Sequence, residues 1–146
     1  MNVFFDTSAF VKYFNVEKGT ERVTRIITNS RNQIWLSDLA RLEIISALFR
    51  KYRSHTINEI QLNSAIQGVN DELQYFNLEN LNQLVIEGSL LLLNKFGKDY
   101  GLRTLDAIHL ATFELVADEK WLFVSCDLTL CKISELLGYK CLNPDL

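Results

Sequence analysis

Short apolar runs alternate with longer amphipathic stretches along this chain of 146 residues. Runs of this kind, bounded by turn-forming or helix-capping residues, are typical of buried strands. They predict strands at residues 3–5, 34–36 and 122–125, and a weaker run predicts a fourth at residues 139–142. Between the strands, apolar residues recur with the period of a helix. They predict helices near residues 8–15, 20–29, 38–53, 57–74, 81–96, 104–117 and 128–137.

The alternation of strands and helices indicates an α/β fold with a parallel sheet. Thr56, followed three residues later by Glu59, predicts a capping box at the start of one helix. Gly97 and Gly138 lie where two helices are expected to end, because glycine adopts the positive φ that such ends favour. The single proline is Pro144, and we find no linker, repeat or low-complexity segment. We therefore expect one domain spanning residues 1–146.

Composition limits the class of protein and the cellular compartment to which this fold can belong. With 48% hydrophobic residues, the chain can bury a substantial core. It shows neither an apolar run of about 18 residues nor a signal peptide, so we expect a cytoplasmic protein that does not span a membrane. The cysteines, Cys126, Cys131 and Cys141, lack the spacing of a zinc site and are expected to be reduced, buried thiols. The net charge of -3 excludes a broad basic surface, so any nucleic acid must bind through local patches.

Two aspartates follow predicted strands. Asp6 comes directly after the strand at residues 3–5, and Asp127 follows residues 122–125 after one intervening residue. The carboxyl ends of parallel strands form the edge where open α/β sheets bind ligands. Each aspartate also begins a predicted helix, and aspartate is a favoured N-cap. Either residue alone is therefore explained about equally well as a helix cap.

A polar stripe runs along the otherwise apolar helix predicted at residues 38–53. Glu43, Ser46, Arg50 and Arg53 share one narrow face when residues are spaced at about 100° around the helix. A helix this apolar must be largely packed, so we expect the stripe to face a cleft or its rim. The alternative is a solvated helix face on which Glu43 pairs with an arginine.

A further acidic position lies in the apolar helix predicted at residues 104–117. Asp106 falls in its first turn, where the helix dipole alone favours a carboxylate. His109 lies on the same face three residues later and could act as a ligand or a base. We expect a packed, hydrogen-bonded histidine instead, because hard metal ions seldom need imidazole.

Four carboxylates at one site repel one another, and this repulsion must be offset. Two like charges about 5 Å apart repel by roughly 3 kcal/mol at an effective dielectric constant near 20. Raised pKa values or bound cations would relieve this repulsion, and Mg²⁺ or Mn²⁺ prefers oxygen ligands. One such ion activates a water, and a second about 4 Å away stabilises the leaving oxygen of a phosphodiester. Because no cysteine or serine nucleophile is evident, metal-activated water is the simplest mechanism.

Four segments together resemble the PIN domains, and within them the VapC-type toxins of toxin-antitoxin modules. Each segment is a weak pattern alone, but their order and the chain length make the match specific, and it covers nearly the whole chain. The segments are VFFDTSAFVKYF, SDLARLEIISALFRK, GLRTLDAIHLATF and FVSCDLTL. The resemblance implies a three-layer α/β/α fold with a central parallel sheet of four to five strands.

The resemblance also implies an active site that binds Mg²⁺ or Mn²⁺ and hydrolyses RNA. The four acids of the family fall, in order, on Asp6, Glu43, Asp106 and Asp127. The hydroxyl two positions before the last acid, typically threonine in the family, is Ser125 here. We assign supporting roles to Ser125 and Thr7, although a helix cap explains Thr7 almost as well.

The resemblance further implies a homodimer and a small antitoxin that inserts a basic C-terminal segment into the acidic site. An anionic pocket attracts such a peptide as readily as it attracts a metal ion. RNA, by contrast, needs cationic contacts. The candidates are Arg50 and Arg53 near Glu43, with Lys12, Lys95, Lys98 and Arg103 elsewhere. Ordinary solubilising charge explains most of these residues better.

The sequence thus predicts an endoribonuclease toxin and leaves three alternatives open. One is a housekeeping PIN nuclease in RNA processing or decay. Another is a binding module that kept the fold without catalysis, although the presence of all four acids argues against it. The last is a different Mg²⁺-dependent phosphohydrolase on a doubly wound fold, which would also place aspartates after strands.

Overall fold

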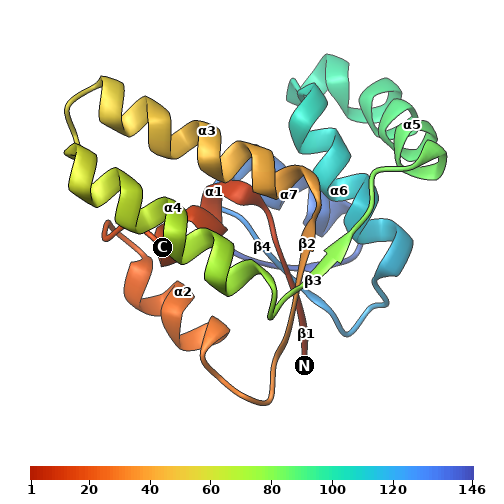
Figure 1. Ribbon diagram of the computed structural model, residues 1–146. Coiled ribbons are helices and arrows are strands. Elements are labelled where there is room, and N and C mark those ends of the chain that lie inside the picture. Colours follow the sequence, from red (N-terminus) through yellow and green to blue (C-terminus); the bar gives the residue numbers. More distant parts are fainter.

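The computed structural model describes residues 1–146 and contains one sheet of five parallel strands (Figure 1). The strands are Asn2–Phe5 (β1), Gln33–Ser37 (β2), Asn77–Glu79 (β3), Leu122–Val124 (β4) and Lys140–Leu142 (β5). Their order across the sheet is β3-β2-β1-β4-β5, so β1 lies at the centre. The helices are Thr7–Phe10 (α1), Thr20–Ile27 (α2), Leu39–Arg53 (α3), Glu59–Leu73 (α4), Gln83–Tyr100 (α5), Thr104–Val116 (α6) and Leu128–Leu136 (α7), and a 3₁₀ turn, Val11–Tyr13, follows α1.

Helices cover both faces of the sheet (Figure 1). Successive side chains of a strand point to opposite faces, so Val3 and Phe5 join one core while Phe4 joins the other. Helices α1 to α4 pack on the first face, with Ile44 fully buried. Helices α5 to α7 pack on the second, where the rings of Phe113 and Phe4 lie 5.5 Å apart. The predicted α/β/α arrangement is confirmed.

Strand β3 is the one strand that the apolar pattern did not predict. Its sequence, Asn-Leu-Glu, has a single apolar residue, and all three residues are half-buried. It pairs only with β2, at the edge of the sheet. Hydrophobic runs identify strands that are covered on both faces, and a short edge strand needs no such run.

The capping box predicted at Thr56 and Glu59 is wrong. The box at the start of α4 is formed by Asn58 and Gln61, whose side chains each bind the other's backbone N–H at 2.8 and 2.9 Å. The Thr56 hydroxyl instead pairs with that of Ser54 in the turn that leaves α3. The turn between the helices is therefore two residues longer than the sequence signal indicated.

The helix end predicted at Gly97 is also wrong, whereas the one at Gly138 is confirmed by a φ of 93° just after α7. Helix α5 continues through Gly97 to Tyr100 and ends at Gly101, which has a φ of 64°. A glycine inside a helix costs only about 1 kcal/mol, which the packing of the surrounding turns offsets. No helix, α5 included, is sufficiently long and apolar to cross a membrane.

Parallel pairing brings the carboxyl ends of the strands to one side of the molecule. Strand β1 leads into Asp6, whose backbone N–H donates to the Val124 carbonyl of β4 at 3.0 Å. Strand β4 leads through Ser125 to Asp127, and β2 leads into α3, which carries Glu43. The fold therefore gathers residues that are distant in sequence at the side where parallel sheets bind ligands.

Candidate active site

A pocket of about 370 Å³ lies at the carboxyl ends of the strands. The predicted acids all line this acidic pocket: Asp6, Glu43, Asp106 and Asp127. Thr7 and two of the candidate RNA contacts, Arg50 and Arg103, also line it, together with His109. Four separate segments of the chain thus contribute one carboxylate each.

Asp6 is the most deeply buried of the acids, with 3% of its surface exposed. Its carboxylate accepts hydrogen bonds from the hydroxyls of Ser8 at 2.8 Å and Ser125 at 2.7 Å, and from the Ala9 backbone N–H at 3.0 Å. Burial raises the pKa of Asp6, and the charge of His109 and these hydrogen bonds only partly oppose the rise. Asp6 is both the N-cap of α1, as expected, and a carboxylate that a nearby cation would stabilise.

Glu43 and His109 form a hydrogen-bonded pair across the pocket. His109 Nε2 binds Glu43 Oε1, and the Thr7 hydroxyl donates to the same oxygen at 2.8 Å. Burial favours a higher Glu43 pKa, but the hydrogen bonds and charge of His109 and the Thr7 hydrogen bond together bring that pKa below its usual value. Because the carboxylate accepts, the Nε2–H form of His109 fits the contact. The packed, hydrogen-bonded histidine that we expected is confirmed, although its buried Nδ1 has no partner.

Asp106 and Asp127 share a single arginine. Arg103 Nε lies 3.2 Å from Asp106 Oδ2, and its Nη2 lies 3.7 Å from Asp127 Oδ2. Burial raises the pKa of Asp106, Arg103 opposes the rise, and the negative charge of Asp127 adds to it. Asp127 also caps α7 by accepting the Leu130 N–H at 2.8 Å, so the cap that the sequence suggested is present.

Two serine hydroxyls link the segments that follow β1 and β4. Ser125, fully buried, donates to Asp6 and accepts the Asp127 backbone N–H at 3.0 Å. Ser8, which the sequence reasoning missed, contacts both oxygens of Asp6 and accepts the Cys126 N–H at 3.0 Å. The available signal for Ser8 was its position two residues after the capping aspartate, where a hydroxyl reaches the carboxylate.

Two of the predicted RNA contacts do not reach the pocket. Arg53 lies at the far end of α3 and lines a different surface depression. Lys12 is buried, and its ammonium contacts Asp145 at 3.0 Å and the Lys18 carbonyl at 2.8 Å. A buried ion pair is costly to break, so Lys12 is not free to bind a polyanion as we expected. Arg50 and Arg103 do line the pocket: Arg50 is exposed at the rim without an ion-pair partner, whereas Arg103 contacts Asp106 and Asp127.

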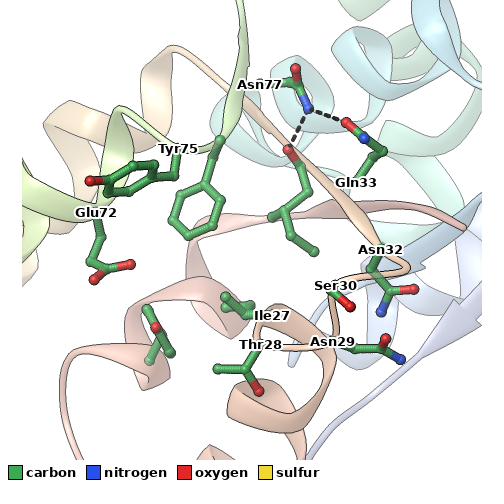
Figure 2. Close-up of a pocket in the computed structure, with 12 residues that line it drawn as sticks. Ile27, Thr28, Asn29, Ser30, Asn32, Gln33, Glu72, Tyr75 and Asn77 are labelled. Carbon is green, nitrogen blue, oxygen red and sulfur yellow. Dashed lines mark hydrogen bonds between the residues drawn. The ribbon is translucent and has the colours of Figure 1, made fainter.

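A second pocket, of about 470 Å³, lies at the amino ends of β2 and β3 (Figure 2). We call it the amide pocket, after the side chains of Asn29, Asn32, Gln33 and Asn77 in its walls. Figure 2 shows Asn77 reaching towards Gln33, and its amide also donates to the Ile34 carbonyl at 3.1 Å. The Asn32 amide likewise donates to the Ile26 carbonyl at 2.9 Å. The Asn32 and Asn77 amides therefore find their partners within the chain.

The sequence and its architecture find a counterpart in a known family. The sequence matches the PIN domain over residues 3–136. The chain belongs to the PIN domain family. Among the curated proteins, none matches this PIN domain in sequence.

Solved structures resemble this PIN domain along its whole length. The toxin-antitoxin complex from Klebsiella pneumoniae aligns with a TM-score of 0.64 and 20% identity over 97% of each chain. FitAcB from Neisseria gonorrhoeae aligns with a TM-score of 0.70 and 14% identity over 97% of each chain. VapBC-1 from nontypeable Haemophilus influenzae aligns with a TM-score of 0.64 and 12% identity over 100% of each chain. At these identities the likeness is one of fold.

The acidic pocket of this PIN domain suits a hydrated cation. No group of three or more His, Cys, Asp or Glu side chains is arranged to hold one metal ion directly. Asp6 is turned towards hydroxyls, and Glu43 towards a hydroxyl and an imidazole. Mg²⁺ commonly binds through one or two carboxylates and keeps several waters. The all-oxygen donor set fits that requirement without forming a closed cage.

Proposed function

We propose that this PIN domain is a Mg²⁺- or Mn²⁺-dependent endoribonuclease and the VapC-type toxin of a toxin-antitoxin pair. The observation that carries the proposal is the convergence of four carboxylates on one pocket. Burying acids destabilises a fold through desolvation, which raises the pKa values of Asp6 and Asp106, and the charge of Asp127 adds repulsion at Asp106. A bound divalent cation would offset the penalty and supply an activated water for phosphodiester hydrolysis.

The residues of the chain would prepare the site in two ways. Asp6, Glu43, Asp106 and Asp127 would hold the metal. Around them, hydroxyl groups fix two of the carboxylates, Thr7 that of Glu43 and Ser125 that of Asp6, and the Ser125 oxygen also accepts the Asp127 backbone N–H. Such outer contacts orient ligands and are typical of functional metal sites. Arg50, at the rim and free of ion pairs, is placed to contact an RNA phosphate.

The toxin assignment implies specific partners. The Klebsiella pneumoniae structure is a toxin-antitoxin complex, and the likeness to it covers 97% of this chain. We propose a cognate antitoxin whose basic segment enters the acidic pocket, because an anionic pocket attracts a cationic peptide. We further propose that residues 1–146 act as one cytoplasmic domain within a homodimer.

The test combines growth with biochemistry. Induced expression in bacteria should arrest growth promptly, and a D6A variant of equal abundance should not. Purified protein, freed of any antitoxin, should cleave a mixed cellular RNA pool with Mn²⁺ and leave it intact with EDTA.

The same assays separate the alternatives. RNA cleavage without growth arrest would identify a housekeeping PIN nuclease. Intact RNA in the presence of Mn²⁺ would identify a binding module without catalysis. Rapid hydrolysis of a small phosphomonoester with no RNA cleavage would identify a phosphohydrolase of another kind.

A further inference from the structure

Arg103 is the only arginine or lysine that forms an ion pair with any of the four acids. Its guanidinium lies between Asp106 and Asp127, at 3.2 and 3.7 Å from their carboxylate oxygens. The three residues come from the starts of α6 and α7, so the arginine joins two walls of the acidic pocket.

Helix formation does not explain an arginine at this position. Arg103 is the N-cap of α6 and makes no capping hydrogen bond with its side chain. A cation at the N-terminus of a helix has the unfavourable sign for the helix dipole. The order of the pair, with the arginine preceding Asp106, is also the less favourable one along a helix. The placement of Arg103 is therefore accounted for by the acids of the pocket.

The ion pairs of Arg103 with Asp106 and Asp127 can be broken at low cost. The Arg103 side chain is 76% exposed, whereas those of Asp106 and Asp127 are 22% and 30% exposed. An exposed ion pair contributes little to stability, because water and salt compete for both charges. A divalent cation on the same carboxylates would therefore displace the guanidinium at small cost. The freed side chain would remain at the pocket rim, where its planar fork matches a phosphate.

We propose that Arg103 serves as an internal counter-cation of the metal-free site and becomes a phosphate-binding residue for RNA when a divalent cation displaces it. The inference rests on the proposed function, because it requires the pocket to bind both metal and RNA. It assigns Arg103 two successive partners, the carboxylates and then the substrate.

Arg50 provides a matched control. It lines the same pocket from α3 and carries the same charge, but it forms no ion pair with the acids. Loss of positive charge alone would affect metal binding similarly in R50M and R103M. Only R103M also removes a group that competes with the metal for its ligands.

The first measurement is Mn²⁺ affinity, taken from the electron paramagnetic resonance signal of free Mn²⁺. We expect R103M to bind Mn²⁺ about two- to fivefold more tightly than R50M, as suits the loss of an exposed ion pair. Circular dichroism confirms folding of each variant. Equal affinities in R103M and R50M would overturn the inference alone. Absence of Mn²⁺ binding in the wild type would overturn the proposed metal site as well.

The second measurement is the binding of a short fluorescein-labelled single-stranded RNA, followed by anisotropy in EDTA and in Ca²⁺, with a gel to verify intact RNA. R103M should lose little RNA affinity in EDTA, where Arg103 is engaged by the acids, and bind RNA several-fold more weakly in Ca²⁺. R50M should bind more weakly in both conditions. A loss in R103M that is the same in EDTA and Ca²⁺ would overturn the change of partner.

Discussion

The acidic pocket and the amide pocket have similar volumes, about 370 and 470 Å³, and lie at opposite ends of the strands of one sheet. They differ in how their polar groups are satisfied. In the amide pocket, the side chain of Asn77 binds the Ile34 carbonyl (Figure 2), and that of Asn32 binds the Ile26 carbonyl. In the acidic pocket, Asp6 is buried as a carboxylate whose pKa is raised.

The comparison shows that volume does not distinguish a site from a structural depression. Satisfied amides stabilise the turns that carry them and gain little from a ligand. Grouped carboxylates lower the stability of the metal-free fold and regain it when a cation binds. The following predictions test this distinction, from the largest expected effect to the smallest.

Removing the charge of Glu43 should abolish most of the activity. E43Q keeps the size of the side chain but removes a charged ligand and weakens the contact with His109. We expect RNA cleavage with Mn²⁺ to fall by about a hundredfold or more while the fold persists. Tyr75→Ala, in an exposed residue of the amide pocket, is the control and should cleave at the wild-type rate. Unchanged cleavage in E43Q would remove Glu43 from the site.

Removing the hydroxyl that joins Asp6 to Asp127 should have a smaller effect. S125A leaves both acids in place but removes the hydrogen bond to the Asp6 carboxylate and the acceptor of the Asp127 backbone N–H. We expect Mn²⁺ affinity and the cleavage rate to fall by about tenfold. S125T, which restores a hydroxyl, should recover most of both. An S125T protein as defective as S125A would show that packing around residue 125, rather than the hydroxyl, is what matters.

Asp106→Asn should stabilise the protein without metal and lose that advantage with metal. The folded-state pKa of Asp106 is raised, so its carboxylate penalises folding above that pKa, and the penalty disappears as the pH falls towards the unfolded value of about 3.9. In EDTA at about pH 7, we expect D106N to unfold about 2–4 °C above the wild type. The difference should shrink towards about pH 4 and reverse in Mn²⁺, as measured by thermal denaturation. A destabilised D106N in EDTA would contradict this account.

Asn77→Ala in the amide pocket should affect stability alone. The substitution removes the hydrogen bond to the Ile34 carbonyl and should lower the free energy of unfolding by about 1 kcal/mol. Urea denaturation measures that loss, and the rate of RNA cleavage should match the wild type once folding is complete. A changed cleavage rate would give the amide pocket a role that its satisfied hydrogen bonds do not suggest.

Most of the architecture was predictable because it follows from burial. The strand at residues 3–5 is covered on both faces and therefore appears as an apolar run, and the same holds for the strand that precedes Asp127. Strand β3 was not predictable in this way, because an edge strand is buried too little to leave a pattern. Helix ends were harder to predict, since Gly97 and Gly101 carry the same local signal and only Gly101 has the positive φ that ends α5.

The acids were predictable because their positions relative to strands and helices fix where they lie. The partners of the charged side chains were not predictable from the sequence. Lys12 and Arg103 look equally free in the sequence, yet Lys12 is buried against Asp145 and Arg103 lies against two of the acids. Those contacts depend on segments that only the folded chain brings together, and a long side chain can reach several of them.

The central position of β1 has a consequence for synthesis. Neighbouring strands are all parallel, so none can pair through a hairpin, and Val3 finds its partner Leu122 only after the intervening residues have been synthesised. Translation at about 5–20 residues per second separates Asp6 from Asp127 by on the order of ten seconds. An unfinished chain of the ribonuclease proposed above would hold Asp6 and Glu43 without the rest of the site. The ribosome would therefore carry an inactive enzyme until Asp127 has been synthesised.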